Sequence, residues 1–302
     1  MTAAIHRRMD ARDWGFLVFL SVLWGGSFFF IGVAVHTMPP FAIVAMRVTV
    51  AAAALWAIVL LTGAPAPRGM RAWLALAGMS ILNNVLPMSL FAWAQGNIPS
   101  SLAAIMNATT PLFGVLLAHV FTSDEKLTAN RAAGVLIGFG GVVVMVGISA
   151  LSSLSIYVVA EIACLIASAS YAASSVYGRR FKGMGLAPLA IAAGQLTCGA
   201  IMLVPATLVF DRPWAMPTPA PEALLAVTAL ALLSTSLAYV IYFRILARAG
   251  ATNLMLVTFL LPVTAIILGV LLLGETLETR HVVGMTMIAL GLAAIDGRPW
   301  QA

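Results

Sequence analysis

The 302-residue chain contains 62% hydrophobic and only 9% charged residues, and its formal net charge is +6. A soluble domain carries about 25% charged residues, so this composition excludes an ordinary water-soluble globular protein. The basic residues lie in short segments between apolar runs, which indicates a membrane topology rather than a nucleic-acid-binding surface.

Apolar runs long enough to cross a bilayer recur along nearly the whole chain. Backbone groups that face lipid must be hydrogen-bonded within the protein, and no alternating barrel pattern is present, so each run is predicted to be a helix. The first run is too long for a signal-peptide core, and no small-residue cleavage site follows it. We therefore predict an all-α polytopic membrane protein with ten transmembrane helices, over residues 14–35, 40–61, 72–94, 99–121, 131–148, 155–178, 186–209, 222–247, 252–272 and 281–296.

Lys and Arg residues are divided very unequally between the two sides of these spans. With the N-terminus inside, the outer segments hold only Arg212 and Arg280, and Arg47 lies within a span. This bias follows the positive-inside rule and predicts a bacterial-type inner membrane protein with both termini cytoplasmic. The inner segments hold all the others: Arg7, Arg8, Arg12, Arg68, Arg71, Lys126, Arg131, Arg179, Arg180, Lys182, Arg244, Arg248 and Arg298.

Two stretches of the chain read as copies of each other. The segment from Pro111 to Gly134 matches the segment from Pro262 to Gly284, and Glu125 is then opposite Glu275. Five spans is an odd number, so the second half must enter the membrane upside down relative to the first. Duplicated, proline-interrupted halves are typical of secondary transporters. We predict two inverted five-helix repeats around a central cavity, with domains 1–148 and 156–302 joined by the linker 149–155.

A set of polar, aromatic and proline residues is predicted near mid-bilayer, from a rise of about 1.5 Å per residue. Polar side chains are costly against lipid, so we expect them to line the cavity, although hydrogen bonds between neighbouring helices are the alternative. Prolines remove backbone hydrogen bonds and bend helices, so Pro87, Pro111 and Pro262 are predicted hinges. The predicted substrate-binding residues are Trp24, Ser27, Asn83, Asn84, Thr110, Tyr171, Ser234, Thr235 and Tyr239.

The early helices of the two halves match more weakly. Arg47 aligns with Gln195, and the pair Asn83 and Asn84 aligns with Ser234 and Thr235.

Two ionisable side chains, Arg47 and Glu161, lie within predicted spans at about 9 Å below the outer boundary. An unpaired charge at this depth is expensive, so each is predicted to find a polar partner, and each is a candidate partner for the other. An outer structural pair or snorkelling is the simpler interpretation. An outer gate or a proton-linked site is the alternative.

The residue pattern favours neither an enzyme nor a metal protein. The histidines are scattered, and Cys164 and Cys198 fall inside apolar runs, so we expect no catalytic residue, metal site or cofactor. Gly134 and Gly138 form a GxxxG motif, and Gly284 and Gly291 repeat part of this glycine pattern in the other half. This pattern predicts close packing of the fifth and tenth spans rather than a place on the pathway.

The order of several motifs resembles the EamA family of the drug/metabolite transporter superfamily. The motifs are L-W-G-G-S-F at 23–28, the prolines 39–40 followed by Arg47, A-I-M-N-A-T-T-P-L-F at 104–113 and G-E-T-L at 274–277, and the resemblance covers essentially the whole chain. It implies inverted five-helix repeats around a central cavity and the export of small metabolites, with amino-acid exporters, including those for aromatic amino acids, as the nearest group. Trp24, Ser27, Arg47 and residues 107–111 match motif positions, whereas Glu125 and Glu275 are interpreted as helix caps.

The sequence thus predicts a secondary transporter that exports small metabolites, with amino acids favoured, by alternating access from a mid-membrane cavity. Its expected partners are a small-molecule substrate and the lipid bilayer, with no nucleic acid, and the sequence carries no signal for an oligomeric state. A lipid or lipid-linked sugar flippase is the alternative function. An integral-membrane enzyme is less favoured because no His, Asp or Glu cluster is present, and a channel is disfavoured by the lack of a repeated filter or charge ring.

Overall fold

The computed structural model describes residues 9–147 and 155–296, and within these residues every regular element is a helix. The first five spans are α1 (Ala11–Ala34), α2 (Pro40–Thr62), α3–η1–α4 (Met70–Ser80, Ile81–Val85, Leu86–Gln95), α5–α6 (Ser100–Asn107, Thr110–Phe121) and α7 (Ala129–Val146). The last five are α8 (Ile156–Gly178), α9 (Pro188–Ala206), α10–η6–α11 (Pro221–Ala231, Leu232–Leu237, Ala238–Leu254), α12 (Val257–Leu273) and α13 (Thr279–Asp296).

These helices confirm the predicted all-α protein of ten spans. The described helices include eight that are long and apolar enough to cross a membrane, and the shorter apolar helices α12 and α13 complete the ten. Most observed ends lie within a few residues of the predicted ones. The largest difference is at α11, which runs to Leu254 rather than ending at residue 247. The chain is therefore a multi-pass membrane protein.

Local sequence explains where several helices begin and end. The side chains of Asp10, Thr128 and Ser155 accept hydrogen bonds from the first turns of α1, α7 and α8, which satisfies amide groups that have no partner inside a helix. Helix α2 ends at Gly63, whose φ of 65° is a left-handed conformation that glycine adopts without strain. Caps of this kind define where these helices begin and end.

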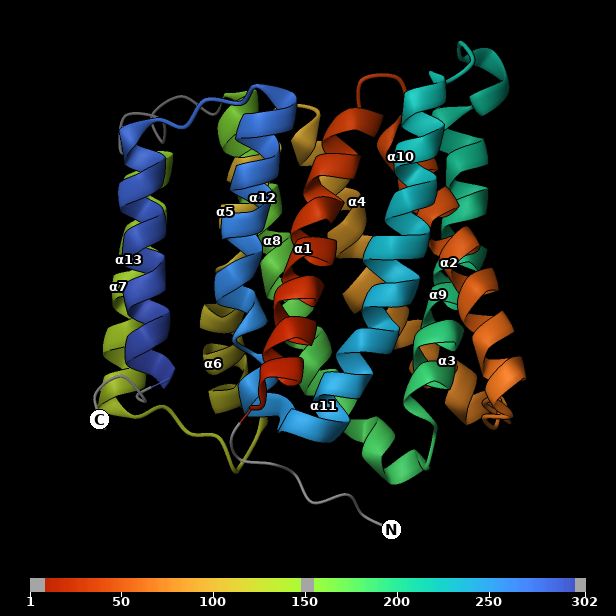
Figure 1. The fold of residues 1–302 in the computed structure, drawn as a ribbon, viewed down its shortest axis with the longest axis horizontal. Helices are drawn as coiled ribbons and strands as arrows, with labels where there is room; N and C mark the ends of the chain where they lie inside the picture. The colour runs from red at the N-terminus through yellow and green to blue at the C-terminus, as the bar shows by residue number, and fades with distance from the viewer. Residues whose placement is uncertain (1–8, 148–154, 297–302) are drawn as a thin grey trace.

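The two halves of the chain start at opposite edges of the molecule (Figure 1). Helix α1 begins at the lower edge of the view, whereas α8 begins at the upper edge, where α7 ends. Helix α13 ends at the lower edge, on the same side as the start of α1. Contacts between the halves also match. The first span of each half packs on the fourth span of the other half, which gives α1 on α12 and α8 on α5 and α6. The second spans, α2 and α9, pack on each other.

Helices α7 and α13 form a closely packed pair at one end of the molecule (Figure 1). A Cβ atom built on Gly134 would lie 2.5 Å from the carbonyl oxygen of Gly291, and one built on Gly284 would lie 2.6 Å from that of Gly141. The two backbones therefore touch at both glycine pairs, which confirms the predicted close packing of the fifth and tenth spans.

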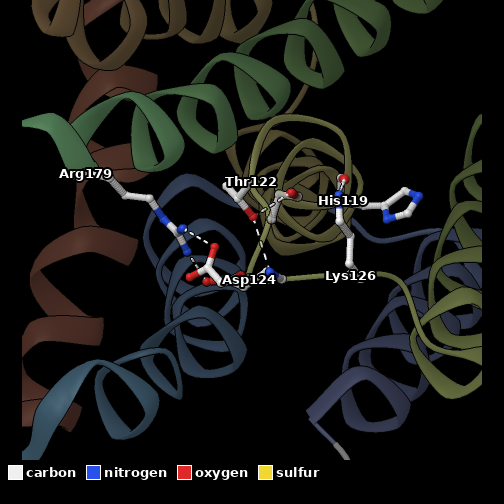
Figure 2. Close-up of polar contacts among 7 residues, drawn as sticks. His119, Thr122, Asp124, Lys126 and Arg179 are labelled. Carbon is white, nitrogen blue, oxygen red and sulfur yellow. Dashed lines mark hydrogen bonds and ion pairs between the residues drawn. The ribbon is translucent and has the colours of Figure 1, made fainter.

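A charged cluster joins the α6–α7 loop to the end of α8 at the lower edge (Figure 2). Arg179 directly follows α8, and its Nη1 donates to Asp124 Oδ1 at 2.7 Å while its Nη2 contacts Glu125 Oε1. From the loop, Lys126 Nζ donates to the carbonyl oxygen of His119, in the last turn of α6, at 3.0 Å. These contacts link the last helices of the first half to the first helix of the second half.

The cluster predicts an acid-sensitive loop. The hydrogen bond from Arg179 holds the pKa of the exposed Asp124 carboxyl below its ordinary value. Such a contact is present at neutral pH and is lost only as the pH falls below about 4 and through the lowered pKa. We expect backbone amides 122–128 to be protected from hydrogen–deuterium exchange at pH 7 and to lose this protection in acid.

In the variant Arg179→Gln, backbone amides 122–128 should exchange as fast at pH 7 as we expect them to in acid for the unmodified protein, after allowance for the intrinsic effect of pH on exchange. The change should be local, because exposed ion pairs contribute little to global stability. Arg180→Gln is the matched control, since this neighbouring guanidinium lies over the ring of Tyr177 rather than on the loop. Equal hydrogen–deuterium exchange of amides 122–128 in Arg179→Gln and the unmodified protein at pH 7 would show that Arg179 does not hold this loop.

Candidate functional site

Both spans that carry the predicted polar pairs depart from α-helical geometry at those pairs. Segment η1, over Ile81–Val85, and segment η6, over Leu232–Leu237, are π-helical turns in the third span of each half. The sequence analysis did not predict them. Isolated π-turns occur frequently at functional sites. Segment η1 contains Asn83 and Asn84, and η6 contains Ser234 and Thr235, so the weak alignment of the two halves here is matched in local structure.

Hydroxyl side chains bind the carbonyl groups at these π-turns. Ser170 Oγ, on α8, donates to the carbonyl oxygen of Leu82 at 2.7 Å. In the second half, Thr235 Oγ1 donates to the carbonyl oxygen of Leu230 at 2.9 Å. The widened turns are thus held by short side chains, which keeps the neighbouring polar groups in fixed positions.

A hydrogen-bonded network joins η1 to three helices of the second half. Asn83 Nδ2 donates to the Tyr239 hydroxyl oxygen at 3.0 Å, and Gln195 Nε2 donates to the same oxygen at 3.0 Å. Ser174 Oγ donates to Asn83 Oδ1 at 3.1 Å, and Asn83 Nδ2 also lies 3.4 Å from Gln195 Oε1. Asn83 and Tyr239 are half-buried. We call Asn83, Ser174, Gln195 and Tyr239 the central network.

Arg47 contacts the other π-turn. Its Nε donates to Thr235 Oγ1 at 2.9 Å, and its side chain is 7% exposed. Arg47 on α2 thus reaches η6 in the same way that its sequence equivalent, Gln195 on α9, reaches η1. Arg47 also lies close enough to Tyr239, a member of the central network, to interact with it electrostatically. Arg47, Thr235 and the central network therefore form one polar site between the two halves.

Glu161 does not join Arg47, so the candidate pairing of these two residues is wrong. The carboxylate of Glu161 makes no hydrogen bond or salt bridge to any residue that the structure describes. Its charged neighbours are Glu278 and Arg280, at the α12–α13 connection. Equal depth along two helices brings their side chains together only if the helices also face each other, and α2 and α8 do not.

Three predicted aromatic residues pack against other rings. Tyr171 is stacked on Phe91 with ring centroids 6.1 Å apart, and Tyr239 is stacked on Phe243 at 6.0 Å. Trp24 lies 5.7 Å from Tyr242. Trp24, Tyr171 and Tyr239 are all half-buried, so none of the three is fully enclosed by the protein.

Other predicted binding residues make no hydrogen bond to this network among the described residues. Ser27 donates to the carbonyl oxygen of Trp24 on its own helix, and Thr110 Oγ1 lies 3.4 Å from Asn107 Oδ1 within its own span. Asn84 is 0% exposed, and neither its amide nitrogen nor its amide oxygen has a hydrogen-bond partner among the described residues. The Ser234 hydroxyl is also buried and unpaired within the described chain.

The three predicted hinge prolines occupy different positions. Pro87 lies in the first turn of α4, directly after η1, and Pro111 lies in the first turn of α6, after a break at residues 108–109. Pro262 lies inside α12, which continues through it as one helix. The fourth span is therefore interrupted next to its proline. In the second half the interruptions come before α12, at Gly250 within α11, whose φ of 80° is not helical, and at residues 255–256.

Two pockets open at the upper edge of the molecule. One has a volume of about 520 Å³, with Trp93 and Met216 in its wall, and the other, of about 310 Å³, is lined by Gln95 and Glu275 among others. His36 and Asn97 line both pockets. None of the predicted binding residues lines either pocket, so these two pockets are separate from the polar site.

The sequence analysis missed Ser170, Ser174 and Gln195 as site residues. Gln195 could have been identified from the sequence, because it is an amide within a span and aligns with Arg47. The two serines could not have been identified in this way, because Ser and Thr are common in membrane helices and usually hydrogen-bond to the backbone of their own helix.

The described residues include no group of three or more His, Cys, Asp or Glu side chains that could hold a metal ion. Cys164 and Cys198 are buried and free. The chemistry that the site offers is therefore hydrogen bonding and charge, from amide, hydroxyl and guanidinium groups.

Comparison with known proteins gives consistent matches over the whole chain. Over 283 residues the chain is 29% identical to the uncharacterized inner membrane transporter YedA of Escherichia coli strain K12, covering 93% of this chain and 89% of that protein. It is 24% identical over 302 residues to a probable amino-acid metabolite efflux pump of the same organism, covering 97% of this chain and 98% of that protein.

A solved crystal structure shares the fold, with a TM-score of 0.66 at 21% identity, and covers 92% of this chain and 95% of the matched chain. The model of one family matches each half separately, over residues 14–147 and 158–295. The chain therefore belongs to the EamA-like transporter family.

Proposed function

We propose that this protein is a secondary transporter that exports small metabolites, with amino acids as the favoured class, by alternating access. Membership of a transporter family supports the general activity. One relative, a probable amino-acid metabolite efflux pump, supports the class of solute. The excess of Lys and Arg on one side supports an inner-membrane location with both termini in the cytoplasm.

The observation that carries the proposal is the polar site between the two halves. Asn83 comes from the first half, whereas Ser174, Gln195 and Tyr239 come from the second, and Arg47 crosses to Thr235 in the same way. We treat residues 1–148 and 156–302 as two inverted repeats joined by residues 149–155. A solute held between two such bodies is exposed to one side or the other as they rock.

The interruptions of the helices supply places for this motion. Pro87 adjoins the π-turn η1, and Pro111 follows a break in the fourth span. Both positions lack a regular backbone hydrogen bond, so bending there costs less than in an intact helix. We assign the hinge role to these positions, with Pro262 as a weaker bend in α12.

Transport into liposomes tests the proposal. The purified protein is reconstituted, and counterflow of a panel of amino acids is measured against liposomes without protein. We expect saturable counterflow of at least one amino acid. Movement of no solute in the panel, together with flipping of a labelled lipid, would favour a flippase instead.

A single substitution then tests the site. Tyr239→Phe removes the oxygen that accepts hydrogen bonds from both Asn83 and Gln195, and it leaves the stacked ring in place. Without this oxygen, Asn83 and Gln195 lose the common acceptor that positions them, so a solute finds the site less well organised. If this costs about 1–2 kcal/mol of solute binding, the half-saturating concentration rises about 5- to 30-fold. The control is Tyr157→Phe, at the exposed start of α8. Equal transport by Tyr239→Phe and the control would show that the network is not part of the binding site.

A further inference from the structure

The guanidinium of Arg47 is a buried cation without a carboxylate partner among the described residues. Its side chain is 7% exposed, and no described acidic residue forms a salt bridge with it. The titratable groups that act on it electrostatically are the phenols of Tyr171 and Tyr239. A buried charge without a counter-ion is costly within a membrane, so this arrangement calls for an anion from outside the chain.

The donors of Arg47 are only partly used. Nε donates to Thr235 Oγ1 at 2.9 Å, and the Thr235 hydroxyl itself donates to the carbonyl oxygen of Leu230 at 2.9 Å. The Thr235 oxygen is therefore fixed as an acceptor and holds one edge of the guanidinium. Nη1 and Nη2 have no hydrogen-bond acceptor within the described chain. These two nitrogens form the edge of the planar group that binds a carboxylate through two parallel hydrogen bonds.

Tyr239 adds a further donor beside Arg47. Its hydroxyl oxygen accepts hydrogen bonds from Asn83 Nδ2 and Gln195 Nε2, both at 3.0 Å. The hydroxyl proton has no acceptor in the described structure, so it is available to a ligand. The site thus holds a surplus of donors and one positive charge, which selects an acceptor-rich anion rather than an amine.

Aromatic rings border this cluster of donors. Tyr171 is stacked on Phe91, and Tyr239 is stacked on Phe243. Half-buried rings beside a polar group suit a ligand with an anionic end and an apolar body.

We propose that Arg47 and Tyr239 bind the carboxylate of the transported solute, through Nη1 and Nη2 of Arg47 and the hydroxyl of Tyr239. This inference rests on the proposed function and narrows it. The solutes are small carboxylates with an apolar or aromatic body, and the carboxylate rather than the amino group is the required feature. Zwitterionic amino acids and simple carboxylic acids both meet this requirement.

Matched pairs of probes separate the carboxylate from the rest of the molecule. The probes are L-phenylalanine with L-phenylalaninamide, L-leucine with L-leucinamide, and 3-phenylpropionate with phenethylamine. Binding is measured on the full-length purified protein by thermal stabilisation, and transport is measured by competition in counterflow. We expect the carboxylates to bind at least about 10-fold more tightly than their amide or amine counterparts. 3-Phenylpropionate has a carboxylate but no amino group. If it binds, the site accepts carboxylates in general, and if it does not bind while the amino acids do, the site accepts amino acids alone.

Substitutions at Arg47 assign this preference to the guanidinium. In Arg47→Gln we expect the discrimination between each carboxylate and its amide to disappear, with a loss of carboxylate affinity of about 10- to 100-fold. Arg47→Lys keeps the charge but lacks the planar fork, so it should restore only part of the preference. Arg244→Gln, an exposed arginine that lies over the ring of Phe16, is the control and should keep the full preference.

The outcomes distinguish this inference from the proposed function. If the protein transports solutes but amides and amines compete as strongly as carboxylates do, the carboxylate site is wrong. The proposal that the protein is a transporter would still hold. Carboxylate binding that depends on Arg47, without movement of any solute, would overturn transport and support the site. If no carboxylate in the panel stabilises the protein, or if Arg47→Gln keeps the preference, the assignment of Arg47 is wrong.

Discussion

Gly134→Leu is expected to separate α7 from α13 and to lower the stability of the whole protein. A Cβ atom at Gly134 would lie 2.5 Å from the carbonyl oxygen of Gly291 and 3.1 Å from the backbone nitrogen of Ile295. Backbone atoms cannot rotate away as a side chain does, so the two helices must move apart along their length. Overpacking in a core costs about 1–3 kcal/mol, and contact with backbone places this site at the upper end of the range. The measurement is the midpoint of thermal unfolding in detergent.

Gly15→Leu is the matched control for this substitution. Gly15 also lies in a helix, but a Cβ atom built there meets no atom within 4 Å. Leucine is a better helix former than glycine by up to about 1 kcal/mol, so the control should be neutral or slightly stabilising. The two variants should thus shift the midpoint in opposite directions. Similar midpoints for both would show that the α7–α13 contact does not contribute to stability.

The positions of the spans could be predicted from the sequence because membrane insertion depends on local composition. A run of about 20 apolar residues leaves few alternatives to a helix in lipid. The helix pair α7–α13 was also predictable, because GxxxG places two glycines on one face of a helix. In both cases the deciding signal lies within one short segment of the chain.

The rotation of each helix about its own axis was not predictable in the same way. Asn83 and Asn84 are neighbours at the same depth, yet successive residues in a helix point about 100° apart. Asn83 therefore reaches the central network, while Asn84 is buried without a partner among the described residues. Depth alone could not separate them. The same limit applies to Arg47 and Glu161, which lie at similar depth on helices that do not face each other.

The π-turns were not predictable because they differ from an α-helix only in a few backbone hydrogen bonds. The residues I-L-N-N-V and L-L-S-T-S-L have no composition that distinguishes them from other membrane helix segments. Their effect on the site is nevertheless large, because an extra residue in a turn changes which side chains face inward. The alignment of Asn83 and Asn84 with Ser234 and Thr235 located these segments without revealing their geometry.

Glu275→Gln is expected to destabilise the upper edge of the molecule. Glu275 Oε1 accepts hydrogen bonds from the backbone nitrogen and the hydroxyl of Ser100, both at 2.7 Å, and Oε2 accepts one from the backbone nitrogen of Ser101 at 2.9 Å. The carboxylate thus caps the start of α5 from the α12–α13 loop, as predicted from its place after a helix. A glutamine can accept at only one of these oxygen positions, and its amide nitrogen would face the donor of Ser101.

The expected loss for Glu275→Gln is about 2 kcal/mol, from the cap and the charge-assisted bonds together. It should appear as a lower unfolding midpoint and as faster hydrogen exchange in the first turn of α5. The control is Glu125→Gln at the repeat-related position. Glu125 does not cap a described helix, contrary to the prediction, and contacts the exposed Arg179 instead.

An exposed ion pair contributes about 0–1 kcal/mol, so Glu125→Gln should leave the midpoint nearly unchanged. The two glutamates occupy matching positions in the two halves of the sequence, but their contacts differ in burial. Glu275 joins a loop of the second half to a helix of the first through buried backbone groups, whereas Glu125 joins two solvent-exposed segments. If Glu275→Gln and Glu125→Gln lower the unfolding midpoint equally, the two glutamates stabilise the protein alike. The cap on α5 would then not account for a special role of Glu275.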